Sequence, residues 1–254
     1  MIQAFKMAMK SISGNKFRAF LTMLGIIIGV MALVILVSLV SGATGTVTDT
    51  IECLGSNLLT VTIADDKGAP VTLDTLNTWM TDPQIGLAAP SATTTANGKY
   101  GSTTNTVTVY GATPAYAPIN GQTVLLGRFL TQADVENHTS VCVIPEKTAE
   151  DMVGYTDCLG EEIALDGMKF TIVGIFKNDD ESLTGILTKN SMMAYIPYTT
   201  LMRLSSTVSS TITGFSVSAP QGGTMAATES AMKRLLLERF ENDEDAFSIL
   251  SQNM

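Results

Sequence analysis

The sequence contains few of the side chains that bind metal ions or act as nucleophiles. Its 254 residues include three cysteines and one histidine, with no CxxC pair and no Cys/His cluster. This composition excludes a disulfide framework and the usual zinc sites. Cys142 and Cys158 are compatible with two interpretations, a disulfide formed in an oxidising compartment, leaving Cys53 unpaired, or buried free thiols. His138 lies in a polar segment without a second histidine, so we expect no metal or triad role for it.

Motifs for nucleotide binding and hydrolysis are absent as well. GxxxxGK[ST], HExxH and GxSxG do not occur, and the one Gly-Lys pair, Gly98-Lys99, is followed by tyrosine. The acidic clusters at residues 179–181 and 241–245 lie in segments expected to be solvated loops. We therefore expect that the chain is not an enzyme, uses no cofactor or metal, and does not bind ATP itself.

Charge is missing from a long stretch near the N-terminus. No charged residue occurs from position 19 to position 48, and the segment from Ala19 to Val40 is almost entirely apolar. As a helix rising 1.5 Å per residue, this segment is roughly 33 Å long, enough to cross a hydrocarbon core of about 30 Å. The stretch predicts a transmembrane helix within residues 19–43.

A cleaved signal peptide is the competing interpretation, because residues 41–43 (SGA) have the small-x-small pattern of a cleavage site. Signal peptides have apolar regions of about 7 to 15 residues, whereas residues 24–40 form a longer run with a long segment before it. Length therefore favours a retained anchor. Lys and Arg precede the run and acidic residues from Asp49 onward follow it, which predicts a cytoplasmic N-terminus and an extracytoplasmic C-terminal domain.

Two further patterns concern the membrane segment. Apolar residues recur at spacings of three and four within residues 2–13, which predicts a cytoplasmic amphipathic helix at the membrane interface within residues 1–18. Inside the apolar run, Gly25 and Gly29 form a GxxxG pattern, which lets two membrane helices approach closely.

The part of the chain after the apolar run is acidic. Beyond residue 41 it has 11 basic and 24 acidic residues, a net charge of −13. Such a domain is not expected to bind nucleic acid or an anionic lipid surface through its charge. Its roughly 210 residues are enough for two compact lobes or one large one.

Helix and strand patterns are mixed throughout this part and predict an α+β fold. Asn97-Gly98 and Asp166-Gly167 are dipeptides typical of two-residue hairpin turns, so we expect a hairpin at each. Gly55 is expected to end a helix that continues from the membrane. The predicted strands cover residues 57–63, two segments within 94–111, 123–126, 141–144, 162–165, 169–176, 193–196, 211–217 and 245–250, and the predicted helices cover residues 72–80, 146–153, 198–204 and 224–240.

Six motifs occur in a characteristic order. They are NKFRAFLTMLGIIIGV at residues 15–30, LGSNL at 54–58, VYGATPAY at 109–116, GRFL at 127–130, FTIVGIF at 170–176 and IPYTTL at 196–201. Together they cover almost the whole chain, which resembles the first transmembrane helix and periplasmic core domain of MacB/FtsX-type permeases of ABC transporters. The motif residues singled out are Gly111, Pro114, Tyr116, Gly127, Arg128, Phe129, Gly174, Pro197 and Tyr198.

The resemblance implies a stalk helix followed by two lobes. An α/β porter-like lobe would comprise residues 44–112 and 207–254, and an inserted β-rich lobe would comprise residues 113–206. Within GRFL, we interpret Gly127 as a turn residue, Phe129 as a core residue and Arg128 as part of an ion pair that orders a loop, rather than as ligand contacts.

The resemblance also implies a function. A separate cytoplasmic ABC ATPase would move the extracytoplasmic lobes of a membrane-bound homodimer or paired permease, for export of amphipathic drugs, peptides or lipoproteins. The alternative is an anchored sensor or regulator that activates a cell-wall hydrolase, as FtsX-type relatives do. Complete permeases of this family have three more spans after the core domain, so we expect this chain to be a truncated permease or a single-span derivative.

Overall fold

The structure, a computed structural model, describes residues 17, 20, 21, 23–34, 58–177 and 192–251. The chain divides into two compact units, residues 1–49 and 50–254. In the first unit the described residues are helical and their large apolar side chains are exposed. Within the described ranges, no helix combines the length and the apolar character needed to cross a membrane.

Much of the predicted membrane segment lies outside the described residues. Ala19, Val40 and Gly55 are not among the described residues. Of the interfacial helix predicted within residues 1–18, only residue 17 is described. Gly25 and Gly29 lie in the described helix, and beyond the helix backbone no atom stands within 4 Å of where their Cβ atoms would be. Both positions therefore have room around them within this unit.

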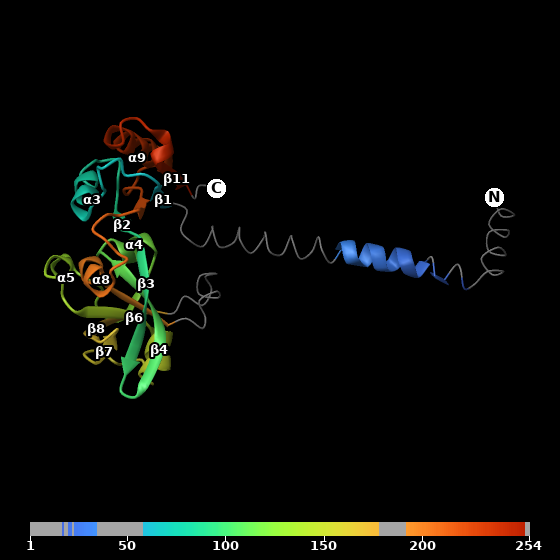
Figure 1. The fold of residues 1–254 in the computed structure, drawn as a ribbon, viewed down its shortest axis with the longest axis horizontal. Helices are drawn as coiled ribbons and strands as arrows, with labels where there is room; N and C mark the ends of the chain where they lie inside the picture. The colour runs from blue at the N-terminus through green and yellow to red at the C-terminus, as the bar shows by residue number, and fades with distance from the viewer. Residues whose placement is uncertain (1–16, 18–19, 22, 35–57, 178–191, 252–254) are drawn as a thin grey trace. The chain divides into compact units, whose positions relative to one another are not determined.

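The second unit contains two sheets, each with its own core (Figure 1). The smaller sheet has the order β11 (Phe247–Ser251), β1 (Leu58–Ile63), β10 (Gly214–Ser218) and β2 (Ala88–Pro90), with antiparallel neighbours throughout. Helices α3 (Leu73–Trp79) and α9 (Met225–Arg239) pack on it, and the 3-10 turn η1 (Glu244–Ala246) leads into β11. We call these elements, residues 58–90 and 214–251, the first lobe.

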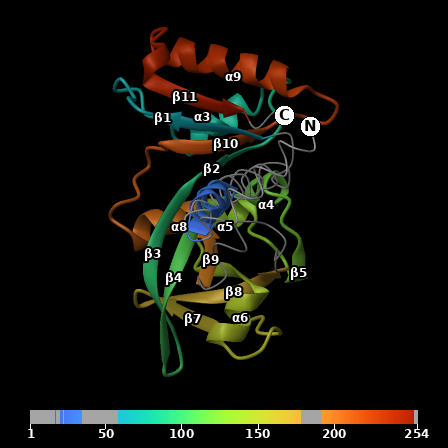
Figure 2. The same cartoon turned by 90° about the vertical axis from the view of Figure 1, so that its right-hand side faces the viewer.

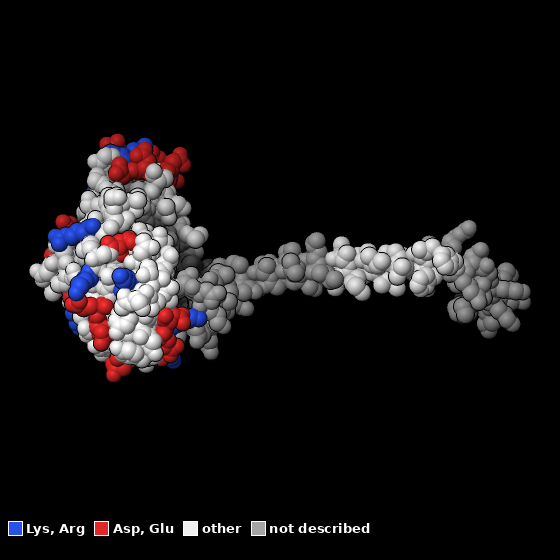
Figure 3. All heavy atoms as spheres, turned by 60° about the horizontal axis from the view of Figure 1, so that its bottom comes forward, with Lys and Arg blue, Asp and Glu red and all other residues white. Residues whose placement is uncertain are grey.

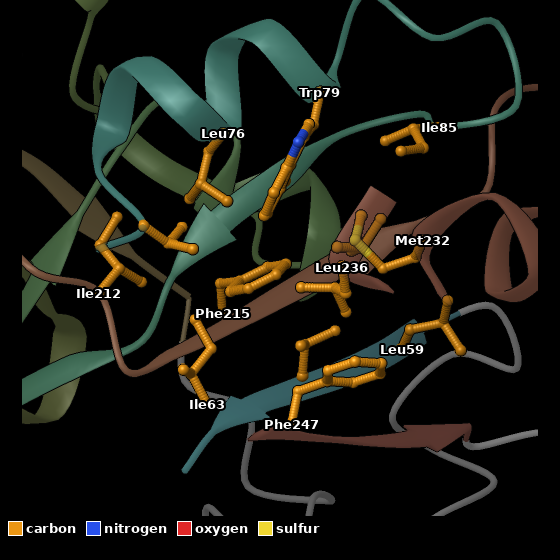
Figure 4. Close-up of a cluster of buried hydrophobic side chains, with 14 of the residues drawn as sticks. Leu59, Ile63, Leu76, Trp79, Ile85, Ile212, Phe215, Met232, Leu236 and Phe247 are labelled. Atoms are coloured by element: carbon orange, nitrogen blue, oxygen red, sulfur yellow. The ribbon is translucent and has the colours of Figure 1, made fainter. Parts of the chain in front are cut away.

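Strand alternation builds the core of the first lobe. Along β1, Leu59 and Val61 are buried on the face that the helices cover, because successive side chains point to opposite faces of a sheet. Trp79 of α3 packs against Phe215 of β10, with ring centroids 5.8 Å apart (Figure 4). Thr72 caps α3 through a capping box, which fixes where the helix begins. The helix predicted over residues 72–80 is therefore present, with Thr72 as its N-cap and Trp79 buried in the core.

The larger sheet contains the strands from β3 to β9, in the order β5-β8-β6-β9-β4-β3-β7. With the four short helices described in this range, it forms the second lobe, residues 92–204. Its strands are β3 (Ala92–Tyr100), β4 (Thr103–Ala112), β5 (Val124–Gly127), β6 (Val141–Pro145), β7 (Glu162–Leu165), β8 (Met168–Phe176) and β9 (Met192–Pro197), and its helices are α4 (Tyr116–Ile119), α5 (Gln132–Glu136), α6 (Glu146–Met152) and α8 (Tyr198–Leu204).

An additional pairing of β7 with β8 closes six strands of this sheet into a ring. Closure gives both edges of β7 a hydrogen-bonding partner, so these strands present fewer free edges to other chains. Apolar side chains from the ring strands fill its interior, and Met152 of α6 and Leu201 of α8 complete that core. Figure 2 shows the second lobe below the four-stranded sheet and α9.

The β3–β4 hairpin turns at a different place from the one predicted. Asn97 and Gly98 lie inside β3, and the turn is formed by Gly101 and Ser102, with Tyr100 paired to Thr103. A Cβ at Gly98 would collide with the Val107 side chain of β4, so this glycine permits close packing inside the ring. The Asn97 backbone N–H and side-chain amide both donate to Asp166 Oδ1, at 2.9 and 3.0 Å.

The other predicted turn is confirmed. Leu165 pairs with Met168, and the two residues between them, Asp166 and Gly167, both have positive φ angles, of 45° and 86°. This is the geometry that Asp-Gly favours in a two-residue hairpin.

Most predicted elements are present with ends shifted by a few residues, and β7 and α8 have the predicted bounds. The predicted patterns did not include β2, α4 or α5. The division between lobes also differs from the expected one, since residues 92–112 form β3 and β4 of the larger sheet. The reason is that β4 pairs in parallel with β9, a strand far away in the sequence.

Candidate functional site

The two lobes are joined by two chain segments that lie side by side. Strand β2 passes into β3 through Ser91 alone, and α8 connects to β10 through residues 205–213. The Ser91 N–H donates to the Gly214 carbonyl oxygen at 2.8 Å. Residues of both segments line a hollow of about 230 Å³, together with Tyr198. The connection between the lobes is therefore concentrated in one place.

Contacts between the lobes are mainly apolar. Leu58 and Ala89 of the first lobe pack with Ile119 of α4. Tyr198 of α8 is buried in the core of the first lobe, where its hydroxyl donates to the Ser209 carbonyl oxygen at 3.1 Å. In contrast, the ion pairs Lys67–Asp243, Arg234–Asp82, Arg128–Asp134 and Lys169–Glu162 each lie within one lobe. An apolar contact of this kind places few directional constraints on the angle between the lobes.

A pocket of about 190 Å³, which we call the junction pocket, opens between the lobes. The first lobe contributes α3 and residues 87–90, and the second lobe contributes residues 113–115 and part of α5. Apart from Asn77, Thr113 and Gln132, the lining is apolar. The other lining residues are Leu73, Leu76, Met80, Leu87, Ala88, Pro90, Pro114, Ala115 and Val135.

Two glycines let two backbone segments of the second lobe touch. Gly127 has a φ of +75°, which glycine adopts without strain, and a Cβ there would collide with the Val173 carbonyl oxygen. A Cβ at Gly174 would collide with the Arg128 carbonyl oxygen, and the Arg128 N–H donates to Val173 at 2.9 Å. The GRFL and FTIVGIF motifs therefore meet, and glycine at both positions allows their backbones to touch.

Arg128 forms the expected ion pair, and its partner is Asp134. Its Nη1 lies 2.6 Å from Asp134 Oδ2 and its Nη2 lies 3.3 Å from Oδ1. The carboxylate also accepts hydrogen bonds from the Thr131 N–H and hydroxyl, at 2.8 and 2.7 Å, and from the Thr139 hydroxyl, at 3.0 Å. Burial alone would raise the Asp134 pKa, but these donors, Arg128 first, hold that pKa well below its usual range. The network fixes α5, whose Val135 lines the junction pocket.

An aromatic cluster lies in the second lobe. Phe129 packs against Phe176 and Tyr116 against Tyr195, with centroids 5.1 and 5.3 Å apart, and Tyr110 stacks on Tyr195 at 5.1 Å. Burial raises the pKa of Tyr116 to about 12. The cluster packs with Ala112 and Ala117, which lie on either side of the segment that begins with Pro114.

Another pair of motifs meets at Gly111. A Cβ at this position would stand 2.6 Å from Leu201 Cδ2 and 3.2 Å from Tyr198 Cδ2, so glycine lets α8 lie directly on β4. Pro197 is the N-cap residue of α8, in an extended-like conformation that ends β9. Of the motif residues, Pro114 lines the junction pocket and Tyr198 is buried in the core of the first lobe, while Gly111, Gly127 and Gly174 allow close contact between elements of the second lobe.

Two residues of the junction were not singled out from the sequence. Asp134 is recognisable in retrospect, because Thr131 followed three residues later by an acidic residue is a capping-box pattern. Thr113 has no such signal. It is only 8% exposed, and its hydroxyl has no hydrogen-bond partner among the described residues.

The structure shows the state of Cys142 and Cys158 and the surroundings of His138. Cys142 and Cys158 are free and buried, so the disulfide interpretation is wrong for this pair, and burial raises the pKa of both thiols. His138 has a φ of 51°, and its Nδ1 is buried without a hydrogen-bond partner. In the described part of the chain, no group of three metal-binding side chains occurs.

The face of the lobes drawn in Figure 3 has acidic and basic side chains around a broad uncharged area.

Comparison with known proteins identifies the family. The model of the MacB-like periplasmic core domain matches residues 19–235. The chain belongs to the MacB-like periplasmic core domain family. This finding confirms the resemblance to MacB/FtsX-type permeases that the motifs indicate.

Curated relatives of this MacB-like chain include macrolide export ATP-binding/permease proteins. The MacB of Neisseria gonorrhoeae is 27% identical over 210 residues, covering 79% of this chain and 32% of the relative. The MacB of Vibrio parahaemolyticus is 27% identical over 258 residues, covering 98% of this chain and 38% of the relative. The chain thus spans about a third of the length of these relatives.

Solved structures share the fold of the MacB-like domain. The periplasmic region of MacB from Actinobacillus actinomycetemcomitans has a TM-score of 0.64 at 21% identity, covering 80% of this chain and 92% of that one. The extracellular domain of the noncanonic ABC-type transporter YknZ from Gram-positive bacteria has a TM-score of 0.61 at 20% identity, covering 76% of this chain and all of that one. These likenesses show that the chain has the mixed α/β fold of those domains.

Proposed function

We propose that this chain belongs to the permease of an ABC transporter, in which ATP hydrolysis by a separate cytoplasmic subunit moves the two extracytoplasmic lobes. The family match and the relatives, whose names describe macrolide export ATP-binding/permease proteins, support an ABC transporter role. These 254 residues contain no phosphate-binding loop, and in this proposal a separate cytoplasmic ABC ATPase supplies ATP hydrolysis.

The observation that carries the proposal is the arrangement of the lobe junction. Two adjacent segments and apolar contacts join the lobes, while the ion pairs named above each lie within one lobe. Interfaces between domains of one chain commonly permit relative movement. Movement of the lobes is thus mechanically easier than deformation of either one.

In this proposal the apolar segment 19–43 is a transmembrane helix with its N-terminus in the cytoplasm. Its orientation follows from the Lys and Arg residues before it. The absence of proline and charge from that segment as far as Asp49 suits a stiff connection from the membrane to the lobes. A paired permease, for which a second copy of this chain is the simplest candidate, would place two such connections on one ATPase dimer, and the cargo would be amphipathic molecules for export.

Spin-label distances across the junction test this proposal. Labels at exposed Thr78 of α3 and Lys99 of β3 report the separation of the lobes, and a matched pair at Lys99 and Glu150 of α6 reports on the second lobe alone. The full chain, with its cysteines replaced, is reconstituted in lipid nanodiscs with a partner ABC ATPase that binds it. We expect ATP analogues to change the Thr78–Lys99 distance but not the control distance. An unchanged distance with a bound ATPase, or ATP affinity of this chain alone in calorimetry, would contradict the proposal.

A further inference from the structure

The junction pocket has the properties of a small-molecule site. An apolar cavity of about 150 Å³ holds one benzene ring, so about 190 Å³ accommodates one substituted six-membered ring. A whole macrolide is far larger than this. The lining contains no ionisable side chain, so an ion placed there would lose its hydration without gaining a partner.

Thr113 gives the pocket its one buried hydrogen-bonding group. Its hydroxyl oxygen has no partner among the described residues, although the residue is 92% buried. Leaving such a buried group unpaired is unfavourable. Thr113 lines the pocket, so a ligand oxygen placed against it would satisfy this hydroxyl.

We infer that the junction pocket binds a neutral ring compound that carries one hydroxyl group, or the corresponding ring of a larger amphipathic molecule. The apolar ring lies among Leu76, Met80 and Val135, and its oxygen pairs with Thr113. Since the two lobes both contribute to the lining, the bound ring contacts both and holds them in one relative arrangement. The inference goes beyond the proposed transport role, because binding requires neither ATP nor an ATPase.

NMR of the full chain in lipid nanodiscs tests the inference, with methionine methyl groups labelled with carbon-13. Met80 lines the pocket, and Met225, buried elsewhere in the first lobe, is an internal reference. The probes are p-cresol and toluene, which differ by one hydroxyl group, and their free concentrations are corrected for uptake into empty nanodiscs. We expect both probes to shift the Met80 methyl resonance saturably and to leave Met225 unchanged.

Three variants separate the contributions of the hydroxyl and the cavity. Thr113→Val should weaken p-cresol binding about tenfold, the equivalent of one good hydrogen bond, and should leave toluene binding within about twofold. Ala115→Leu, which fills the pocket, should abolish the saturable shift for both probes. Thr95→Val, on the exposed face of β3, is the matched control and should change nothing.

Two results would each overturn the inference. One is the absence of a saturable Met80 shift in the parent chain with either probe up to its solubility. The other is p-cresol binding to Thr113→Val that is as tight as binding to the parent, which is informative even if Ala115→Leu fails to fold. Neither result bears on the proposed transport role, because the lobe-distance experiment uses neither probe.

Discussion

The Arg128–Asp134 network should determine the local stability of the α5 region, and Asp134→Asn tests this. Asparagine has the size of aspartate, so the substitution creates no cavity, but it removes the charge and replaces one acceptor oxygen with a donor. The Asp134 carboxylate is 8% exposed and accepts hydrogen bonds from Arg128, Thr131 and Thr139. The amide nitrogen of asparagine would face at least one of these donors.

The expected loss is about 2 kcal/mol. A hydrogen bond to a charged group contributes about 1.5–3 kcal/mol and a neutral one about 1 kcal/mol, so each donor loses part of its interaction. The expected loss is near the low end of the summed hydrogen-bond contributions, because the Arg128 side chain is 47% exposed and water replaces part of its lost interaction. Two kcal/mol corresponds to an increase of about 30-fold in the population of locally opened molecules.

Hydrogen exchange measured by mass spectrometry on the full chain in nanodiscs is the suitable assay. Peptides covering residues 128–139 contain backbone amides that the network holds, including those of Asp134 and Thr139. Their protection should fall about 30-fold in Asp134→Asn, while peptides from α9 in the first lobe should not change. Lys169→Met, which removes an exposed ion pair with Glu162, is the control and should leave all peptides unaffected.

A change of less than threefold in peptides 128–139 would refute this reasoning, provided that the variant is folded elsewhere. It would mean that the charged network contributes no more than an exposed surface pair. A uniform loss of protection in both lobes would contradict the local assignment of the effect instead.

The remaining predictions concern pH, one glycine and the isolated domain. The Asp134 pKa is held below its unfolded value of about 3.9, so the contribution of this carboxylate to stability is complete above about pH 5 and is lost as the pH falls further. Peptides covering residues 128–139 should therefore lose protection from hydrogen exchange below pH 5 in the parent but not in Asp134→Asn. Gly127→Ala should lower the free energy of unfolding by at least about 3 kcal/mol in urea denaturation, whereas Gly160→Ala, with a similar φ but open space around it, should cost about 1 kcal/mol. A protein of residues 44–254 should give a folded circular-dichroism spectrum, since both lobes have complete apolar cores, and an unfolded spectrum would contradict the lobe assignment.

The local elements of the fold could be predicted because their causes are local. Thr72 caps α3 through residues within the next turn, and Asp166-Gly167 adopts a turn that those two residues favour by themselves. The charge-free segment and the family motifs are likewise properties of the sequence order. In the candidate site, the same holds for the turn at Gly127 and the charge of Arg128.

Other features depended on contacts between residues far apart in the sequence. Asn97-Gly98 favours a turn locally, but its place opposite Val107 and its hydrogen bonds to Asp166 keep it inside a strand. The parallel pairing of β4 with β9 moved the lobe boundary, because a pair separated by some 80 residues leaves no periodic trace in either strand.

The junction pocket and its unpaired Thr113 hydroxyl also depend on contacts between residues far apart in the sequence. By itself the sequence determined the family, the order of the elements and the local role of the GRFL motif, since backbone preference and side-chain periodicity act over a few residues. Only the tertiary structure decided which residues share a cavity, because a cavity is the space left when two lobes pack, and no single segment contains it.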